Sequence, residues 1–115
     1  METIHFITTN RHKVEEAKEV MKEFNIKVVQ IRAEKNEPKE ISIEQIAKLN
    51  AAKFYKKYKK PVVVEDTGVF FAAYPNFPGN QPKIMFNLLG YRGLLRLLEG
   101  ETREAEFRAV VGYCD

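Results

Sequence analysis

The chain has 115 residues, of which 44% are hydrophobic and 30% charged, and its formal net charge is +3. This length predicts a single domain over residues 1–115, and a hydrophobic share of this size excludes a disordered chain. The net charge is too small for a dedicated nucleic-acid-binding surface, and no apolar run reaches the roughly 20 residues of a membrane span. The N-terminus lacks the features of a signal peptide and the one cysteine, Cys114, has no internal partner, so we expect a cytoplasmic protein.

The first part of the chain predicts a strand, a helix and a second strand. Residues 3–8, TIHFIT, are typical of a short buried strand. Residues 12–24 carry apolar side chains at spacings of three and four, which predicts an amphipathic helix, and residues 26–31 are rich in β-branched side chains. The apolar positions of the predicted helix are Val14, Ala17, Met21 and Phe24. The strand–helix–strand order predicts an α/β fold with a mixed or parallel sheet.

A polar loop over residues 32–40 leads to a second predicted helix. Ser42 and Gln45 have the spacing of a capping box, which predicts that the helix begins at residue 43. The helix is expected to run to about Tyr58, ahead of Pro61. Its apolar stripe consists of Ile43, Ala47, Ala51, Phe54 and Tyr58.

The second half of the chain predicts two more strands and an interrupted helix. PVVVED, residues 61–66, is typical of a strand that is buried on both faces, ends at its two acids and is followed by a turn. Two helical pieces are expected on either side of Gly90, and residues 104–115 alternate as in a strand, which would have an exposed edge unless something pairs with it. The predicted fold is therefore a three-layer-like mixed sheet flanked by helices.

The segment ITTNRHK is the first candidate binding motif. A strand that ends in small polar residues and opens a helix can bind phosphate, because the first N–H groups of the helix lack partners. Asn10 suits the N-cap, Thr8 and Thr9 offer hydroxyl groups, and Lys13 adds a positive charge in the first turn. The residues alone leave two interpretations open, a phosphate site or a plain helix cap with solvated basic side chains.

The segment VVVEDTG is the second candidate motif. Its two acids follow a buried strand and are expected at the carboxyl edge of the sheet, where α/β proteins bind ligands. Because successive side chains of a strand point to opposite faces, Glu65 and Asp66 are expected to have different roles, and one of them can hold Mg²⁺. Thr67 and Gly68 would form a tight turn under the ligand. The alternative is a strand end with acids in water, which is less favourable beside three valines.

Two further segments carry positive charge. FPGNQPK, residues 77–83, presents Lys83 after a Pro-Gly loop, and the residues alone favour an ordinary turn. KFYKKYKK, residues 53–60, interleaves lysine with tyrosine and could be a nucleic-acid patch. Helical spacing favours a structural role for this run, with lysines complementing the helix dipole while Phe54 and Tyr58 pack inward.

Five segments resemble, in the same order, those of the inosine triphosphate pyrophosphatase family, whose members are also called Ham1-like proteins or XTP/dITP pyrophosphatases. The segments are TTNRHK, EPKEISIEQ, VVVEDTGVFF, FPGNQPK and EAEFRAVVGY. The resemblance covers residues 3–115 and is strongest to the archaeal and eukaryotic branch. It implies the N-terminal portion of the Ham1/Maf-like fold, Mg²⁺-dependent hydrolysis of ITP, dITP and XTP to monophosphate and pyrophosphate, and a homodimer.

The resemblance also implies roles for individual residues. The triphosphate would be held by Thr8, Thr9, Asn10 and Lys13, with Lys13 also counted as catalytic, and Lys83 would contact a phosphate. Glu34 would be a metal ligand, Asp66 a metal ligand or the general base for the attacking water, and Glu65 would lie beside it as a further ligand. Thr67 and Gly68 would line the substrate site.

The sequence departs from the family pattern in three places. Thr9 stands where many relatives have Gly, and residues 80–82 replace a segment that often contains Pro and Tyr. The aromatic-Gly-Asp-Pro and Ser-His-Arg segments, which grip the purine base in relatives, do not occur in this sequence. The first alternative to an enzyme is therefore a truncated, catalytically impaired nucleotide-binding or dimerising domain, and the second is a nucleic-acid-binding module.

Overall fold

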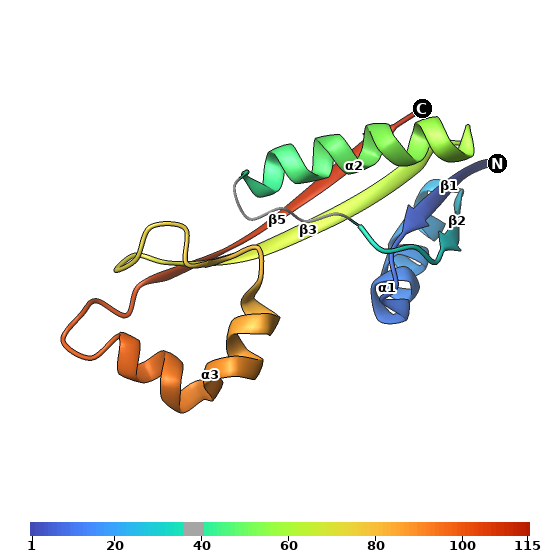
Figure 1. The fold of residues 1–115 in the computed structure, drawn as a ribbon. Helices are drawn as coiled ribbons and strands as arrows, with labels where there is room; N and C mark the ends of the chain where they lie inside the picture. The colour runs from blue at the N-terminus through green and yellow to red at the C-terminus, as the bar shows by residue number, and fades with distance from the viewer. Residues whose placement is uncertain (36–40) are drawn as a thin grey trace. The chain divides into compact units, whose positions relative to one another are not determined.

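The computed structural model describes residues 1–35 and 41–115, and its elements are shown in Figure 1. The chain divides into two compact units, the first formed by Met1–Asp66 with Val110–Asp115 and the second by Thr67–Ala109. Five strands form one hydrogen-bonded sheet in the order β2-β1-β3-β4, and β5 pairs with β3. The predicted polar loop at residues 32–40, and part of the EPKEISIEQ segment, lie outside the described residues.

The first unit is built around parallel strands. Strand β1 (Glu2–Ile7) lies between β2 (Ile26–Ile31) and the beginning of β3, and it pairs parallel with both. His5 of β1 lies opposite Val62 of β3. Parallel pairing brings the carboxyl ends of β1 and β2 to the same edge of the sheet, so the residues that follow these two strands emerge together.

Helix α1 (Arg11–Met21) packs on one face of this sheet. A buried cluster of Phe6, Val14 and Val28 joins the helix to β1 and β2. A 3₁₀ turn, Lys22–Phe24, follows the helix, and the side chain of Phe24 is 64% exposed, so its expected place on the apolar stripe is wrong. A 3₁₀ turn has about three residues per turn, which rotates Phe24 away from the stripe that 3.6 residues per turn would continue.

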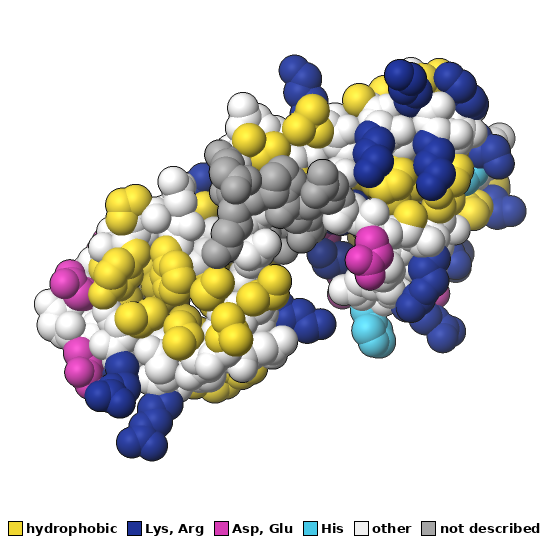
Figure 2. Space-filling view, viewed as in Figure 1, with side chains coloured by type: hydrophobic (Ala, Val, Ile, Leu, Met, Phe, Trp, Pro, Cys, Tyr) yellow, Lys and Arg dark blue, Asp and Glu magenta, His cyan; other side chains and the backbone are white. Residues whose placement is uncertain are grey.

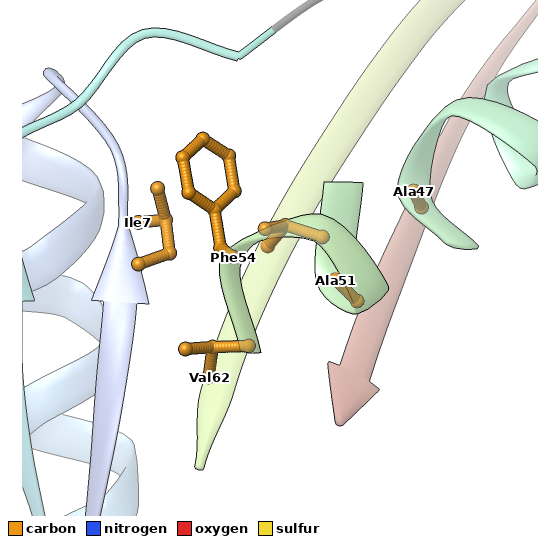
Figure 3. Close-up of a cluster of buried hydrophobic side chains, with 6 residues drawn as sticks. Ile7, Ala47, Ala51, Phe54 and Val62 are labelled. Atoms are coloured by element: carbon orange, nitrogen blue, oxygen red, sulfur yellow. The ribbon is translucent and has the colours of Figure 1, made fainter. Parts of the chain in front are cut away.

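Helix α2 (Ile43–Tyr58) packs on the other face and has the predicted boundaries. Its capping box is formed, because the Ser42 side chain accepts from the N–H of Gln45 and the Gln45 side chain reaches back to the N–H of Ser42. Figure 3 shows the core beneath this helix, which comprises Ile7, Ala47, Ala51, Phe54, Val62 and Val64. Neighbouring residues of β1 thus contact different helices, since Phe6 packs with α1 and Ile7 with α2, and the first unit has three layers.

Strand β3 (Val62–Phe71) differs from its prediction in two respects. Its side chains alternate between buried and half-buried along Val62–Gly68, whereas burial on both faces was expected. The strand also continues through Glu65 and Asp66, whereas the sequence predicted an end there. The two acids therefore lie within a strand, and its regular alternation fixes the faces to which they point.

Thr67 and Gly68 lie inside β3, so the tight turn predicted for them is wrong. In the second unit, strand β4 (Pro78–Gly79) pairs antiparallel with β3, and Val69 lies opposite Gly79. This pairing with residues further along the chain extends the strand. Gly68 permits the close approach, because a Cβ atom at this position would lie 2.9 Å from the carbonyl oxygen of Gly79.

Helix α3 (Pro82–Leu97) of the second unit is interrupted as predicted, because Gly90 has non-helical angles of φ 66 and ψ 177. Figure 2 shows hydrophobic side chains at the surface of this unit, and those of Leu88 and Tyr91 are 73% and 75% exposed. Strand β5 (Ala105–Cys114) follows and confirms the predicted final strand. Among the helices of the described residues, none combines the length and the apolar character that crossing a bilayer would require.

Candidate phosphate-binding and acidic site

The N-terminus of α1 is ordered by hydrogen bonds to the side chains of Thr8 and Asn10. Thr8 is buried, and its Oγ1 accepts from the N–H of Asn10 at 3.0 Å. Oδ1 of Asn10 accepts from the N–H of Lys13 at 3.2 Å, which confirms Asn10 as the N-cap. Thr9, between them, is exposed. The first turn of α1 contains no acidic residue, so the positive end of the helix dipole is not neutralised within that turn.

Lys13 reaches from α1 to the acid on the near face of β3. Its Nζ lies 2.9 Å from Oε2 and 3.0 Å from Oε1 of Glu65. The two side chains are 34% and 18% exposed. An ion pair that retains this much contact with water contributes little to folding stability. The Lys13 side chain is thus only partly buried.

Lys35 makes the corresponding contact on the other side of β3. Its Nζ donates to the backbone carbonyl of Glu65 and lies 3.4 Å from Oδ1 of Asp66. The side chains of Lys35 and Asp66 are only 13% and 2% exposed. Burying a carboxylate to this degree is unfavourable unless positive charge or hydrogen bonds compensate it, and Lys35 supplies such a charge.

Glu65 and Asp66 point to opposite faces of the sheet, as their adjacent positions in a strand predicted. Glu65 meets Lys13 on the face that α1 covers, whereas Asp66 is buried in phase with Val62 and Val64, which pack beneath α2. The predicted difference in role thus has a structural basis. One carboxylate is partly solvated and the other is enclosed.

The contacts form one continuous run across the sheet, which begins at the uncharged N-cap Asn10 and then alternates between positive and negative side chains. In order, the run contains Asn10, Lys13, Glu65, Lys35 and Asp66. Its members come from just beyond the carboxyl ends of β1 and β2 and from the middle of β3. This is the edge at which α/β sheets bind ligands, and the run combines a helix N-terminus, which favours anions, with two acids.

The acids offer donors suited to a hard cation. Glu34 is exposed and adjoins Lys35 in the chain, and with Glu65 and Asp66 it supplies the carboxylate oxygens that Mg²⁺ prefers. Within residues 1–35 and 41–115, no three His, Cys, Asp or Glu side chains are gathered closely enough to hold a metal by themselves. Mg²⁺ usually takes one or two carboxylates and completes its coordination with water and phosphate oxygens, so it does not require all three acids at one point, and the enclosed carboxylate of Asp66 fits it. The metal roles of these three residues remain predictions.

The sequence model of one protein family, the Ham1 family, matches residues 4–115. The chain belongs to the Ham1 family. It is 39% identical over 106 residues to a dITP/XTP pyrophosphatase of Ignicoccus hospitalis, an alignment that covers 90% of this chain and 56% of the relative. It is 40% identical over 111 residues to a dITP/XTP pyrophosphatase of Methanopyrus kandleri, with 96% and 59% covered. The chain thus spans less than two thirds of the length of these two Ham1 relatives.

Solved structures of Ham1 proteins have the same fold. A HAM1 protein from Coxiella burnetii superposes with a TM-score of 0.71 at 20% identity, and the match covers 98% of this chain and 63% of the other. The Ham1 protein of Staphylococcus aureus gives a TM-score of 0.64 at 18% identity, with 96% and 62% covered. These similarities confirm the predicted α/β class and the Ham1-like fold.

Three residues of the Ham1 motifs lie in the second unit. Thr67 is half-buried in β3, and Gly68 is buried there beside β4. Lys83 is exposed in the first turn of α3. Gly68 has an evident structural function in the packing of β4. The substrate-binding roles of the three residues remain predictions.

Sequence reasoning missed two residues of the run and its surroundings. The sequence places Lys35 in a polar loop and Gln30 in a predicted strand, and it indicates a functional role for neither. In the structure, Nε2 of Gln30 donates to the backbone carbonyl of Thr8 at 2.9 Å. One feature of the sequence, the strand–helix–strand order, could have indicated both Lys35 and Gln30. If β1 and β2 are parallel neighbours, the residues at the carboxyl end of β2 must lie beside the end of β1.

The lysine-tyrosine run at residues 53–60 has the structural role that helical spacing favoured. Phe54 is buried and its ring stacks on that of Tyr58 with centroids 6.1 Å apart, so these two aromatic rings pack against the protein. The lysines of the run are exposed, and Figure 2 shows Lys and Arg side chains on the surface around α2. This arrangement provides no row of free aromatic rings on which bases could stack.

Proposed function

We propose that this chain hydrolyses deaminated purine nucleoside triphosphates, namely dITP, XTP and ITP, to the monophosphate and pyrophosphate. The observation that carries the proposal is the run from Asn10 to Asp66, which connects an anion-binding helix end to two carboxylates at the ligand-binding edge of the sheet. The relatives named dITP/XTP pyrophosphatases support the substrate class. Hydrolysis breaks the oxygen bridge between the α- and β-phosphorus atoms and adds the elements of one water molecule to the two fragments.

The helix end and Lys13 are assigned to the triphosphate. The amides of the first turn of α1 point outward from a helix whose first turn contains no acid, and Lys13 adds a full positive charge. Lys13 can contact a phosphate oxygen without leaving the neighbourhood of Glu65, because its side chain is long and remains partly exposed. Thr8 would contribute to triphosphate binding indirectly, because its Oγ1 accepts a hydrogen bond from the N–H of Asn10 and so orders the start of the helix.

Asp66 is assigned as the principal ligand of Mg²⁺, with Glu34 as a further ligand. Asp66 lies at the enclosed end of the run, and its Oδ1 already faces a cation, the ammonium group of Lys35. Glu65 fits this role less well, because both of its carboxylate oxygens lie within 3.0 Å of Lys13. When bound, Mg²⁺ would neutralise phosphate charge and help to orient the reacting groups. Lys13 would contribute in the same way, by stabilising charge on the phosphate oxygens.

A second candidate function is a nucleotide-binding or dimerising domain that lacks turnover. The chain covers 56% and 59% of the length of the two dITP/XTP pyrophosphatases. Such a domain would bind a triphosphate without releasing pyrophosphate. We propose that either form is a homodimer in the cytoplasm, which size-exclusion chromatography with light scattering and cell fractionation can test.

The proposed activity is tested by measuring pyrophosphate release from dITP, XTP, ITP and ATP with Mg²⁺ present. We expect release from the three deaminated nucleotides and a loss of at least about a hundredfold in Asp66→Asn, because an amide is a poor substitute for a carboxylate ligand. Lys48→Met, which changes an exposed lysine of α2, is the matched control and should retain activity. If the unmodified chain releases pyrophosphate from none of the four, the enzyme assignment is wrong. Calorimetry with ITP and Mg²⁺ then distinguishes a binding domain from one with no nucleotide affinity.

A further inference from the structure

Lys35 is more deeply enclosed than the other lysine of the run. Its side chain is 13% exposed, compared with 34% for Lys13. A lysine ammonium is strongly hydrated, and burying it is unfavourable unless specific partners replace the water. Its partners among the described residues include the backbone carbonyl of Glu65 and the carboxylate of Asp66. The ammonium group of Lys35 is therefore held by specific contacts, and one of them is to Asp66, the acid that the proposed function assigns to a metal ion.

The geometry separates two roles for the Lys35 ammonium group. This group donates one hydrogen bond to the backbone carbonyl of Glu65 and a second, long one to Oδ1 of Asp66. Its distance to Oδ1 of Asp66 is 3.4 Å, longer than the roughly 2.7–2.9 Å of a strong charge-assisted hydrogen bond. Lys35 thus neutralises the carboxylate mainly through charge and does not take up its oxygen in a tight bond. A carboxylate held in this way can exchange one cation for another.

We propose that Lys35 is a positioning residue that serves as an exchangeable counter-ion of Asp66. Without a divalent metal, its ammonium group balances the charge of the enclosed carboxylate. When a divalent cation binds Asp66, two positive groups compete for one carboxylate, and Lys35 turns to an anion that arrives with the metal, namely a phosphate oxygen. Both steps rest on the metal and phosphate assignments of the proposed function, but neither requires that the chain hydrolyse a nucleotide.

The competition has a consequence for metal affinity that a purely structural role would not produce. Removing the charge of Lys35 relieves the repulsion between the two cations, so a divalent ion should bind Asp66 more tightly in the absence of nucleotide. Removing a structural support would loosen the site and weaken metal binding. Couplings between adjacent binding events typically change affinity by about fivefold or more, and we expect an increase of at least this size.

The experiment compares Mn²⁺ affinity in the nucleotide-free chain and in two variants, by electron paramagnetic resonance or calorimetry. Lys35→Gln removes the charge and retains a donor for the Glu65 carbonyl, so it preserves the structural contact. Lys35→Arg retains the charge and should bind Mn²⁺ as weakly as the original chain. Lys48→Met, on the exposed surface of α2, is the control for a general loss of positive charge. Circular dichroism verifies that each protein is folded.

Tighter Mn²⁺ binding in Lys35→Gln alone supports the proposal. Equal or weaker binding in that variant, or no binding in either protein, overturns it. If Lys35→Gln does not fold, the test is made on the original chain, in which Mn²⁺ binding should tighten at least about fivefold when inorganic tripolyphosphate is present, and unchanged affinity overturns the proposal. The measurement of Mn²⁺ affinity does not depend on turnover. A chain that hydrolyses no nucleotide therefore disproves the proposed function and leaves this inference to the affinity measurement. Equal Mn²⁺ affinities in a chain that is active disprove only the inference.

Discussion

The two faces of the sheet in the first unit are covered very differently. Under α2, the side chains of Ile7, Val62 and Val64 are all 0% exposed. On the face of α1, the same sheet borders an open groove of about 590 Å³, where Val111 and Tyr113 of β5 are 68% and 53% exposed. One face is a closed core, whereas the other has a small core beneath α1 and an apolar surface beside it.

The difference extends to the charged residues at the sheet edge. Asp66 belongs to the closed face and its side chain is 2% exposed, whereas Glu65 belongs to the open face and is 18% exposed. Charges interact more strongly where water is excluded, so the Lys35–Asp66 contact is expected to influence ligand binding more than the Lys13–Glu65 pair. Neighbouring acids of one strand can therefore serve separate purposes, because each lies among the residues of its own face of the sheet.

The largest effect is expected from opening the closed face. Phe54→Ala removes a side chain that is 2% exposed and leaves a cavity beneath α2, so we expect a loss of about 3–5 kcal/mol in the free energy of unfolding. Urea denaturation monitored by circular dichroism measures it. Phe24→Ala is the matched control, since this ring is 64% exposed and its removal should change stability by less than about 0.5 kcal/mol. Similar losses at both positions would contradict the distinction between a closed core and a solvated helix end.

An intermediate effect is expected at the charged end of the open face. Lys13→Met should lower the affinity for inorganic tripolyphosphate about tenfold, or about 1.4 kcal/mol, because it removes one charge-assisted contact. The free energy of unfolding should change by less than about 1 kcal/mol, since the ion pair with Glu65 is partly exposed. Calorimetry and urea denaturation give the two values. A variant that lost stability but kept its affinity would show that Lys13 is a structural residue.

The smallest effect is expected on the open face itself. Val111→Thr exchanges a methyl group for a hydroxyl on a side chain that is 68% exposed, and the stability should stay within about 0.5 kcal/mol of the original. Thermal melting at two protein concentrations measures it. A loss above about 1 kcal/mol that grows with concentration would show that this face is covered in solution by another copy of the chain.

Features governed by neighbouring residues could be predicted from the sequence. The capping box at Ser42 and Gln45, the N-cap at Asn10 and the break at Gly90 each depend on a few adjacent residues, and all three are confirmed. The alternation that separates Glu65 from Asp66 is local as well, because it follows from strand geometry alone.

Features that depend on distant residues could not be predicted in the same way. Strand β3 continues past Asp66, where it has β4 as a partner, and it also pairs with β5; nothing in the residues near Thr67 indicates either pairing. Lys35 lies in a polar segment without periodicity, and its place beside Asp66 results from the parallel arrangement of the strands. The metal role of Glu34 was inferred from the family resemblance alone, and a phosphate role for Lys83 was not favoured by the residues alone; both remain predictions.

Because side chains alternate along β3, the site depends on whether the number of residues between the core valines and the acids is odd or even. Deleting or inserting a single residue between Val62 and Glu65 would exchange the two acids between the faces, while hardly altering their distance along the strand. A glutamate would then be enclosed beneath α2 and an aspartate would face α1, too short to occupy the place of the longer side chain. The spacing between Val64 and Asp66 must therefore stay an even number of residues if both are to lie on the face beneath α2. An insertion or deletion of two residues preserves this arrangement, whereas a change of one residue reverses it.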